Sequence, residues 1–149
     1  MPDQIDLQLA QRLIDEHSTL PGAMLPILHA IQEQFSYVPA EVVPLIADSL
    51  NFSRAEVAGV LSYYHFFRQQ APAKHVLQIC RAEACQSMGS EALAAHARAL
   101  LDSSSADVTL EPVYCLGQCG CAPAILLDEQ LYGRVTAERL AELINRRTS

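Results

Sequence analysis

Apolar positions in the first 70 residues recur at intervals of three and four, which is the spacing of one face of a helix. The clearest stripe is made by Met24, Ile27, Leu28, Ile31 and Phe35. Further helices are expected around the apolar stripe of residues 7–14, over residues 42–50, and after Ser53. Ser53 and Glu56 stand at the spacing of a capping box, which gives the fourth helix the best-defined start. The pattern therefore predicts a helical bundle over residues 1–70.

The pattern changes after residue 70. A β-branched run predicts a strand over residues 75–79, a helix is expected over 90–101, and residues 109–114 predict a second strand. Pro112 cannot donate to a neighbouring strand, so this second strand is expected at a sheet edge. Residues 124–132 predict a hairpin and Thr136 the cap of a last helix. The order predicts an α+β protein whose second domain, residues 71–149, is a four-stranded mixed sheet with flanking helices.

Composition and charge exclude several classes of protein. Of 149 residues, 50% are hydrophobic and 18% are charged, as in a globular protein, and the formal net charge is -7. An acidic chain without a basic stripe argues against nucleic-acid binding. The longest apolar run, residues 59–67, is too short to span a bilayer, and the Met-Pro-Asp start lacks the features of a signal peptide. We expect a cytoplasmic protein without direct membrane insertion.

All five cysteines lie between Cys80 and Cys121, which indicates a site, because the cytoplasm keeps thiols reduced. Cys80-x4-Cys85 follows the first predicted strand and Cys115-x3-Cys119 the second. A strand–helix–strand order makes the strands parallel, so both loops emerge at one edge of the sheet. Four thiolates there need cations, supplied by zinc or by an iron–sulfur cluster. Neither pair has the tight C-x2-C spacing typical of structural zinc sites, which favours iron–sulfur; a zinc-stabilised adaptor is the alternative.

Residues beside the cysteines suggest supporting roles. Gly89, Gly117 and Gly120 allow the backbone to approach sulfur closely and to aim N–H groups at it. Arg81 is expected to offset part of the negative charge of a cluster. Cys121 is expected to be a packed or half-exposed free thiol, because four ligands already satisfy the metal.

Residues 63–67 form the densest aromatic stretch and are expected on the fourth helix. Two interpretations remain open, which are burial between the two halves of the chain and exposure as a docking face for a partner. His65 and His75 lack the spacing of a Rieske site, in which two histidines replace two cysteines, and are expected on a helix surface or in a linker. No carboxylate pair suggests acid–base chemistry, so no catalytic site is expected on this chain.

These motifs resemble those of a known family. Cys-x4-Cys, followed by Cys-Leu-Gly-x-Cys and Ala-Pro, is similar to the thioredoxin-like [2Fe–2S] subunit of complex I and its relatives in NAD-reducing hydrogenases and formate dehydrogenases. The similarity includes the helical half at residues 26–28, 37–39 and 59–64. It implies a thioredoxin-like sheet and one [2Fe–2S] cluster. The implied ligands of its iron are Cys80, Cys85, Cys115 and Cys119.

Within that family, residues 80–89 most resemble the gamma subunit of cytoplasmic NAD-dependent formate dehydrogenase. Complex I members often carry Trp after the second cysteine, where this chain has Gln86. The resemblance implies an electron-transfer subunit that exchanges single electrons with an FMN- and NAD-binding flavoprotein subunit. Formate would be oxidised at a molybdenum cofactor on a large subunit. The equivalent subunit of complex I or of an NAD-reducing hydrogenase is the alternative.

Overall fold

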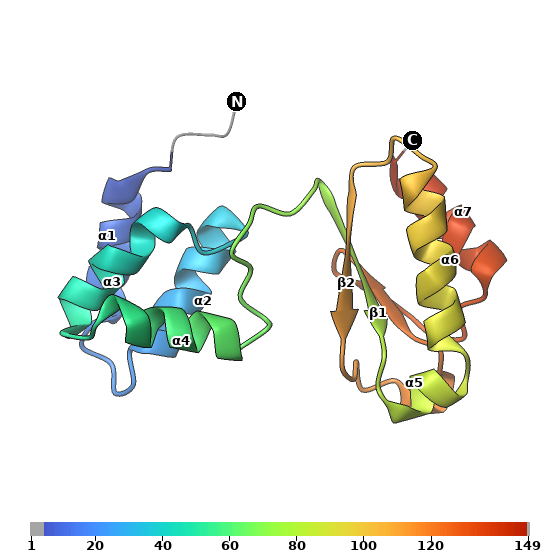
Figure 1. Ribbon diagram of the computed structural model, residues 1–149, viewed down its shortest axis with the longest axis horizontal. Coiled ribbons are helices and arrows are strands. Elements are labelled where there is room, and N and C mark those ends of the chain that lie inside the picture. The colour runs from blue at the N-terminus through green and yellow to red at the C-terminus, as the bar shows by residue number, and fades with distance from the viewer. Residues whose placement is uncertain (1–4, 149) are drawn as a thin grey trace. The chain divides into compact units, whose positions relative to one another are not determined.

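The computed structural model describes residues 5–148, which fall into two compact units separated between Ala71 and Pro72 (Figure 1). Each unit has its own hydrophobic core. The division falls where the sequence pattern changes from helices to strands. No helix among the described residues is long and apolar enough to cross a membrane.

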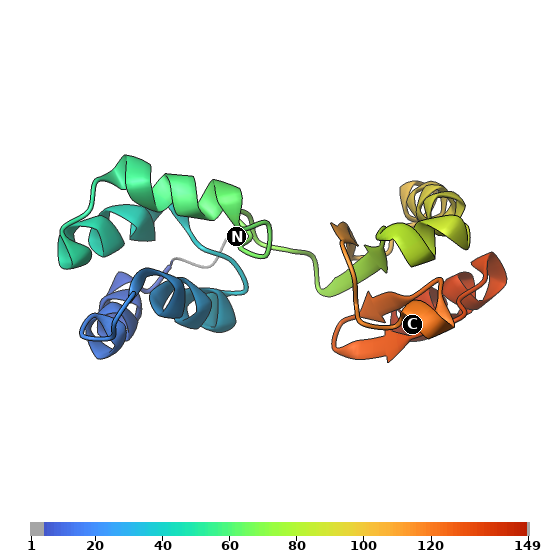
Figure 2. The ribbon, with the colours of Figure 1, turned by 90° about the horizontal axis from the view of Figure 1, so that it is seen from below.

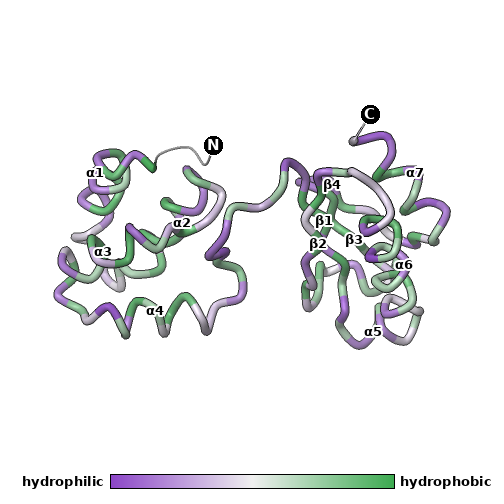
Figure 3. Tube along the Cα trace, turned by 45° about the horizontal axis from the view of Figure 1, so that its top comes forward, coloured by the Kyte–Doolittle hydropathy of each residue, from purple (hydrophilic) through white to green (hydrophobic). Residues whose placement is uncertain are grey.

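The first unit consists of helices. They are α1 (Leu7–His17), α2 (Met24–Phe35), the short 3-10 helix η1 (Ala40–Val42), α3 (Val43–Leu50) and α4 (Arg54–Tyr63). Figure 3 shows hydrophobic and hydrophilic residues intermixed along α1, α2, α3 and α4. The inward stripes supply a core in which each fully buried aliphatic side chain contributes about 1.5–3 kcal/mol. Its largest members are Ile14, Ile27, Leu28, Ile31 and Ile46.

Helix α4 begins as the sequence predicts but ends earlier. The Ser53 hydroxyl accepts from the Glu56 N–H at 3.2 Å, and the Ser53 N–H donates to the Glu56 carboxylate at 2.8 Å, which completes the capping box. The expectation that the whole aromatic stretch is helical is wrong. Tyr64 already has an extended backbone, and α4 ends at Tyr63.

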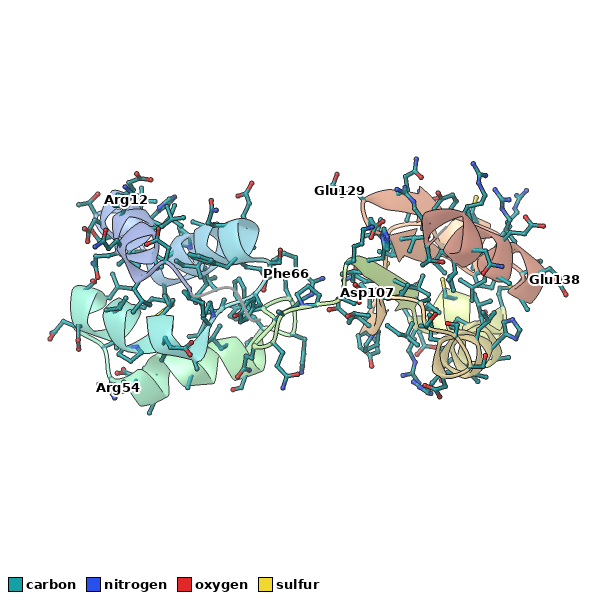
Figure 4. The ribbon with its side chains drawn as sticks, turned by 90° about the horizontal axis from the view of Figure 1, so that it is seen from above. Arg12, Arg54, Phe66, Asp107, Glu129 and Glu138 are labelled. Carbon is teal, nitrogen blue, oxygen red and sulfur yellow. The ribbon has the colours of Figure 1, made fainter. Side chains whose placement is uncertain are left out.

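A buried amide holds the segment that follows α4. Gln32 donates to the Phe66 carbonyl at 2.8 Å and accepts from the Arg68 N–H at 2.6 Å. With the backbone satisfied in this way, Phe67 enters the core of the first unit, where it is only 5% exposed. Tyr63 and Phe66 are 75% and 63% exposed, and Phe66 is labelled in Figure 4. The stretch is therefore part core and part surface of the first unit.

The second unit is a mixed four-stranded sheet with helices. Its elements are β1 (His75–Cys80), α5 (Glu83–Ser87), α6 (Ser90–Asp102), β2 (Val108–Val113), η2 (Cys119–Cys121), β3 (Ile125–Leu127), β4 (Gln130–Tyr132) and α7 (Ala137–Thr148). The strand order is β2-β1-β3-β4, in which β1 is parallel to β2 and antiparallel to β3 (Figure 2). The expected α+β fold, with β2 at an edge, is confirmed.

Helices α6 and α7 share one core with the sheet. Leu77 and Ile79 from β1 pack in the same cluster as Leu93 from α6 and Leu140 from α7. The parallel pairing places Cys80, the last residue of β1, opposite Val113, the last residue of β2. The loops that follow these two strands therefore leave the sheet at one edge.

Candidate metal centre

The four cysteines predicted to bind metal come from four separate places at this edge of the sheet. Cys80 ends β1, Cys85 lies in α5, Cys115 follows β2 and Cys119 begins η2. Cys80 and Cys85 are almost completely buried, at 3% and 2% exposure, whereas Cys115 and Cys119 are exposed. The site thus has one side inside the protein and one side open to solvent.

The thiols contact one another in two pairs. The Cys80 and Cys85 side chains interact with each other, and so do those of Cys115 and Cys119. The hydrogen bond to Cys115 raises the pKa of the Cys119 thiol, and its interactions with the Cys115 and Cys80 charges raise it further. Charge interactions therefore connect the two pairs, and the structure brings all four predicted residues together.

Backbone N–H groups surround the Cys80 sulfur. Burial raises the pKa of the Cys80 thiol, but the Ala82 N–H, the Cys85 thiol and the N–H groups of Cys115 and Leu116 together lower it below its ordinary value. Hydrogen bonds of this kind stabilise negative charge on sulfur. The loop after β2 thus contributes donors to a cysteine at the end of β1.

Two further backbone donors reach the other cysteines. The Gly117 N–H points at the Cys115 sulfur at 3.4 Å, and Gly117 has the left-handed backbone (φ 74°) that favours glycine. Burial raises the pKa of the Cys85 thiol, and the Ala124 N–H opposes that rise in part. The expectation that a glycine loop aims an N–H at sulfur is confirmed at Gly117. The N–H donors at Ala82 and Ala124 could not be predicted from the sequence, because any residue type except proline supplies a backbone N–H.

Arg81 has a carboxylate partner of its own. Its guanidinium makes a forked ion pair with Glu91, at 2.6 and 2.5 Å, and Glu91 lies in the first turn of α6. A guanidinium held by a carboxylate in this way has its charge already compensated. Arg81 therefore connects the cysteine loop to α6.

Cys121 is half-buried in η2 and packs against Gly133. A Cβ atom added to Gly133 would lie 2.7 Å from the Cys121 Cβ, so only glycine fits there. The Cys121 carbonyl also accepts from the Arg134 N–H at 2.7 Å. Cys121 is thus held by packing, as expected for a fifth thiol that is not needed as a ligand.

The residues present fit an iron–sulfur cluster. Two thiol pairs with N–H donors aimed at their sulfurs suit a cluster, whose charge is spread over several sulfur atoms.

A thioredoxin-like sheet that carries four convergent thiols defines a class of small electron-carrying iron–sulfur proteins. The comparison with protein families agrees: the model of the thioredoxin-like [2Fe-2S] ferredoxin family matches residues 10–148. The chain belongs to this family, whose members bind one [2Fe–2S] cluster. The cofactor expected from the sequence is thereby confirmed.

Similar proteins with known roles are subunits of redox enzymes. The NADP-reducing hydrogenase subunit HndA of Solidesulfovibrio fructosivorans is 30% identical over 83% of this chain and 75% of that protein. An NADH-quinone oxidoreductase subunit of Aquifex aeolicus is 30% identical over 99% of this chain and 95% of that protein. The corresponding NADH-quinone oxidoreductase subunit of Mycobacterium tuberculosis is 28% identical, and the match covers 91% of this chain but only 56% of that protein.

A solved structure agrees with the fold. The NAD+-reducing [NiFe]-hydrogenase in the H2-reduced state matches 80% of this chain with a TM-score of 0.65 and 25% sequence identity. The match spans only 21% of that chain, so most of the hydrogenase polypeptide has no counterpart here. The family expected from the motifs is therefore confirmed, and the parent enzyme is a matter for proposal.

Proposed function

We propose that Cys80, Cys85, Cys115 and Cys119 ligate the iron of one [2Fe–2S] cluster, and that the chain carries single electrons as a subunit of an NAD-linked oxidoreductase. The convergence of the four thiols at the edge where β1 and β2 end supports this most directly. The two contacting pairs suit two irons, each of which takes two of the four thiolates.

The chain's own residues set the conditions for electron transfer. When bound, a [2Fe–2S] cluster accepts and returns one electron at a time. The buried pair, Cys80 and Cys85, keeps water from one side of the site, and the exposed pair leaves the other side open to a partner. N–H groups of Ala82, Leu116 and Ala124 stabilise the negative charge of the thiolates. No catalytic step is assigned to this chain.

The parent enzyme in our proposal is a cytoplasmic NAD-dependent formate dehydrogenase. Its partners would be an FMN- and NAD-binding flavoprotein subunit and a large molybdenum-containing subunit. The resemblance of residues 80–89 to the gamma subunit of that enzyme supports this assignment. The named relatives come from hydrogenases and NADH-quinone oxidoreductases, so the equivalent subunit of either enzyme is the second candidate.

The cofactor is tested on the purified chain. Protein prepared without oxygen should be red-brown, hold about two iron and two sulfide ions per chain, and lose visible absorption on reduction. The reduced form should give an S = 1/2 EPR signal at low temperature. A colourless preparation with one tightly bound zinc would contradict the proposal and support the zinc-stabilised adaptor.

The parent enzyme is tested by purification of the tagged chain from its own cells. We expect FMN and molybdenum in the complex, NAD reduction with formate, and negligible activity of the chain alone. Reduction of NAD by H2, or of quinone by NADH, without formate activity would replace formate dehydrogenase by the second candidate. A tagged Cys80→Ser chain serves as the control for activity that does not depend on the iron site.

A further inference from the structure

A groove of about 420 Å³ runs along α4 on the surface of the first unit. Its lining residues come from α2, from the segment before α4 and from α4 itself, and include Met24, Phe52, Glu56, Gly59, Val60 and Tyr63. The last four follow one another at intervals of three and four, so they lie on one face of the helix. The groove therefore follows α4 for about two turns.

Aromatic side chains border this groove and remain exposed. Phe52, Tyr63 and Tyr64 are 46%, 75% and 42% exposed, and the two tyrosine rings meet edge to face with their centroids 5.0 Å apart. A second face of α4 is also apolar, because Val57 and Leu61 are buried in the core. A helix with apolar residues on several faces is usually covered on each of them. An exposed apolar patch of this kind usually marks a contact with another molecule.

Gly59 lies in the interior of α4, where glycine destabilises a helix relative to alanine. The packing of the chain does not require it, since a Cβ atom added to Gly59 would meet no atom of the described residues within 4 Å. The absence of a side chain deepens the groove and allows a second backbone to approach α4 closely. A partner that packs on α4 from outside would explain the glycine.

The charges around the groove indicate which kind of partner fits it. Residues 5–71 carry seven carboxylates but only three arginines, so the first unit is acidic. In the Glu56 carboxylate, Oε2 accepts from the N–H and the hydroxyl of Ser53, whereas Oε1 has no hydrogen-bond partner among the described residues. Oε1 is therefore available to a basic side chain of a partner. A second copy of this acidic unit would instead meet repulsion between like charges.

We infer that the groove along α4 binds an amphipathic helix of another subunit. The apolar face of that helix packs on Gly59 and Tyr63, and a lysine or arginine beside this face pairs with Glu56. Grooves that follow a helix face accept a partner helix through its residues at i, i+3, i+4 and i+7. The inference rests on the function proposed above, because it takes the chain to be one subunit of a larger complex. Since the groove belongs to the first unit and the cysteines to the second, binding and iron content can be measured separately.

The test uses the tagged full-length chain, purified with its partner subunits from its own cells. Gly59→Leu fills the groove. Ala58→Leu is the matched control, because Ala58 is the neighbouring exposed residue of α4 and does not line the groove. Gly59→Ala adds one methyl group, for which the free chain has room. Each variant is measured for retained subunits by quantitative mass spectrometry, for iron content and for its unfolding temperature.

We expect Gly59→Leu to have normal iron but to retain less than about a tenth of the partner subunits that the wild type retains. Ala58→Leu should retain the wild-type amount. Gly59→Ala should raise the unfolding temperature of the isolated chain by about 2–8 °C, because alanine favours the helix. Wild-type retention of subunits in Gly59→Leu, or an equal loss in Ala58→Leu, would overturn the inference.

A photo-crosslinking residue, benzoylphenylalanine, in place of Tyr63 identifies the occupant of the groove even if Gly59→Leu does not fold. Mass spectrometry should find it joined to another subunit, in a segment with apolar residues at helical spacing and a lysine or arginine beside them. A cross-link to a second copy of this chain, to an acidic or non-helical segment, or to no subunit would overturn the inference. Absence of iron and sulfide from the wild type would instead refute the proposed function.

Discussion

The cysteines of this chain differ in burial and in the contacts of their sulfurs, and substitution should separate them. Serine at Cys80, Cys85, Cys115 or Cys119 replaces a soft thiolate by a hard, weakly acidic hydroxyl. We expect each of these variants to retain less than about a tenth of the wild-type iron, since a cluster needs all four ligands. Cys121→Ser, which changes a thiol packed against Gly133, should keep nearly all of its iron and its EPR line.

Iron content and EPR spectra of the five variants measure this difference. Loss of iron in Cys121→Ser together with retention in Cys119→Ser would show that the ligand in this loop is misassigned.

The convergence of the four ligands could be predicted, because strand–helix–strand order fixes which loops meet. The fit of Gly133 against Cys121 could not, because it depends on side-chain packing that has no sequence signature.

At the scale of elements, Asp128 connects the β3–β4 turn to β1 and to α7. It lies in the β3–β4 turn, accepts from the Val76 N–H at 3.0 Å and from the His75 ring at 3.1 Å, and is 3.8 Å from Arg147 of α7. Burial raises the pKa of Asp128, but these three partners outweigh it and hold the pKa below its ordinary value. Asp128 therefore stabilises the fold above its ordinary pKa, and this contribution is lost as the pH falls through the lowered value.

Asp128→Asn should destabilise the chain by about 1–2 kcal/mol at pH 7, because it removes a charged acceptor but keeps an oxygen for Val76. Asn also tolerates the left-handed backbone of this position (φ 55°). Urea unfolding at pH 7 and below pH 4 measures the effect. The difference from the wild type should shrink in acid. Glu129 is an exposed neighbour in the same turn. The Glu129→Gln variant should therefore have the wild-type free energy of unfolding at both pH values. A difference that stays constant with pH would contradict the role of the charge.

The sequence predicts most elements. It misses very short elements and features that depend on contacts between residues far apart in the chain. Helix α5 has only five residues, one of which is Cys85, too few for a helical period to show. His75 begins β1, in agreement with the strand predicted over residues 75–79, so its expected place on a helix surface or in a linker is wrong. Its pairing with a carboxylate 53 positions away could not be predicted. The segment after α4 is held by the buried amide of Gln32, which lies on another helix.

At the scale of the whole molecule, the two separate cores predict separate responses to loss of iron. Buried residues of the first core extend from Ala10 to Phe67, and those of the other clusters begin at Leu77. In the Cys80→Ser variant, amide hydrogen exchange should rise at least tenfold in residues 81–89 and 114–123. This follows because ligation closes those loops. Exchange in α1 to α4 should stay within about a factor of two of the wild type.

Hydrogen exchange followed by mass spectrometry makes this comparison, with Cys121→Ser as the variant that keeps its iron. Equal acceleration in both units would show that they unfold as one cooperative body. Unchanged exchange in the two loops would show that ligation does not hold them.

The edges of the sheet limit the ways in which another protein can bind to it. The Arg81 N–H donates to the Val113 carbonyl, so Val113 faces β1, and alternation turns the nitrogen of Pro112 to the open side of β2. Proline has no N–H to offer there, and β4, at the opposite edge, is only three residues long. Neither edge can extend the sheet by a full-length strand from a second chain. Recognition of this unit should therefore depend on side chains and exposed loops, which leaves the sheet protected from strand-to-strand aggregation while a partner is absent.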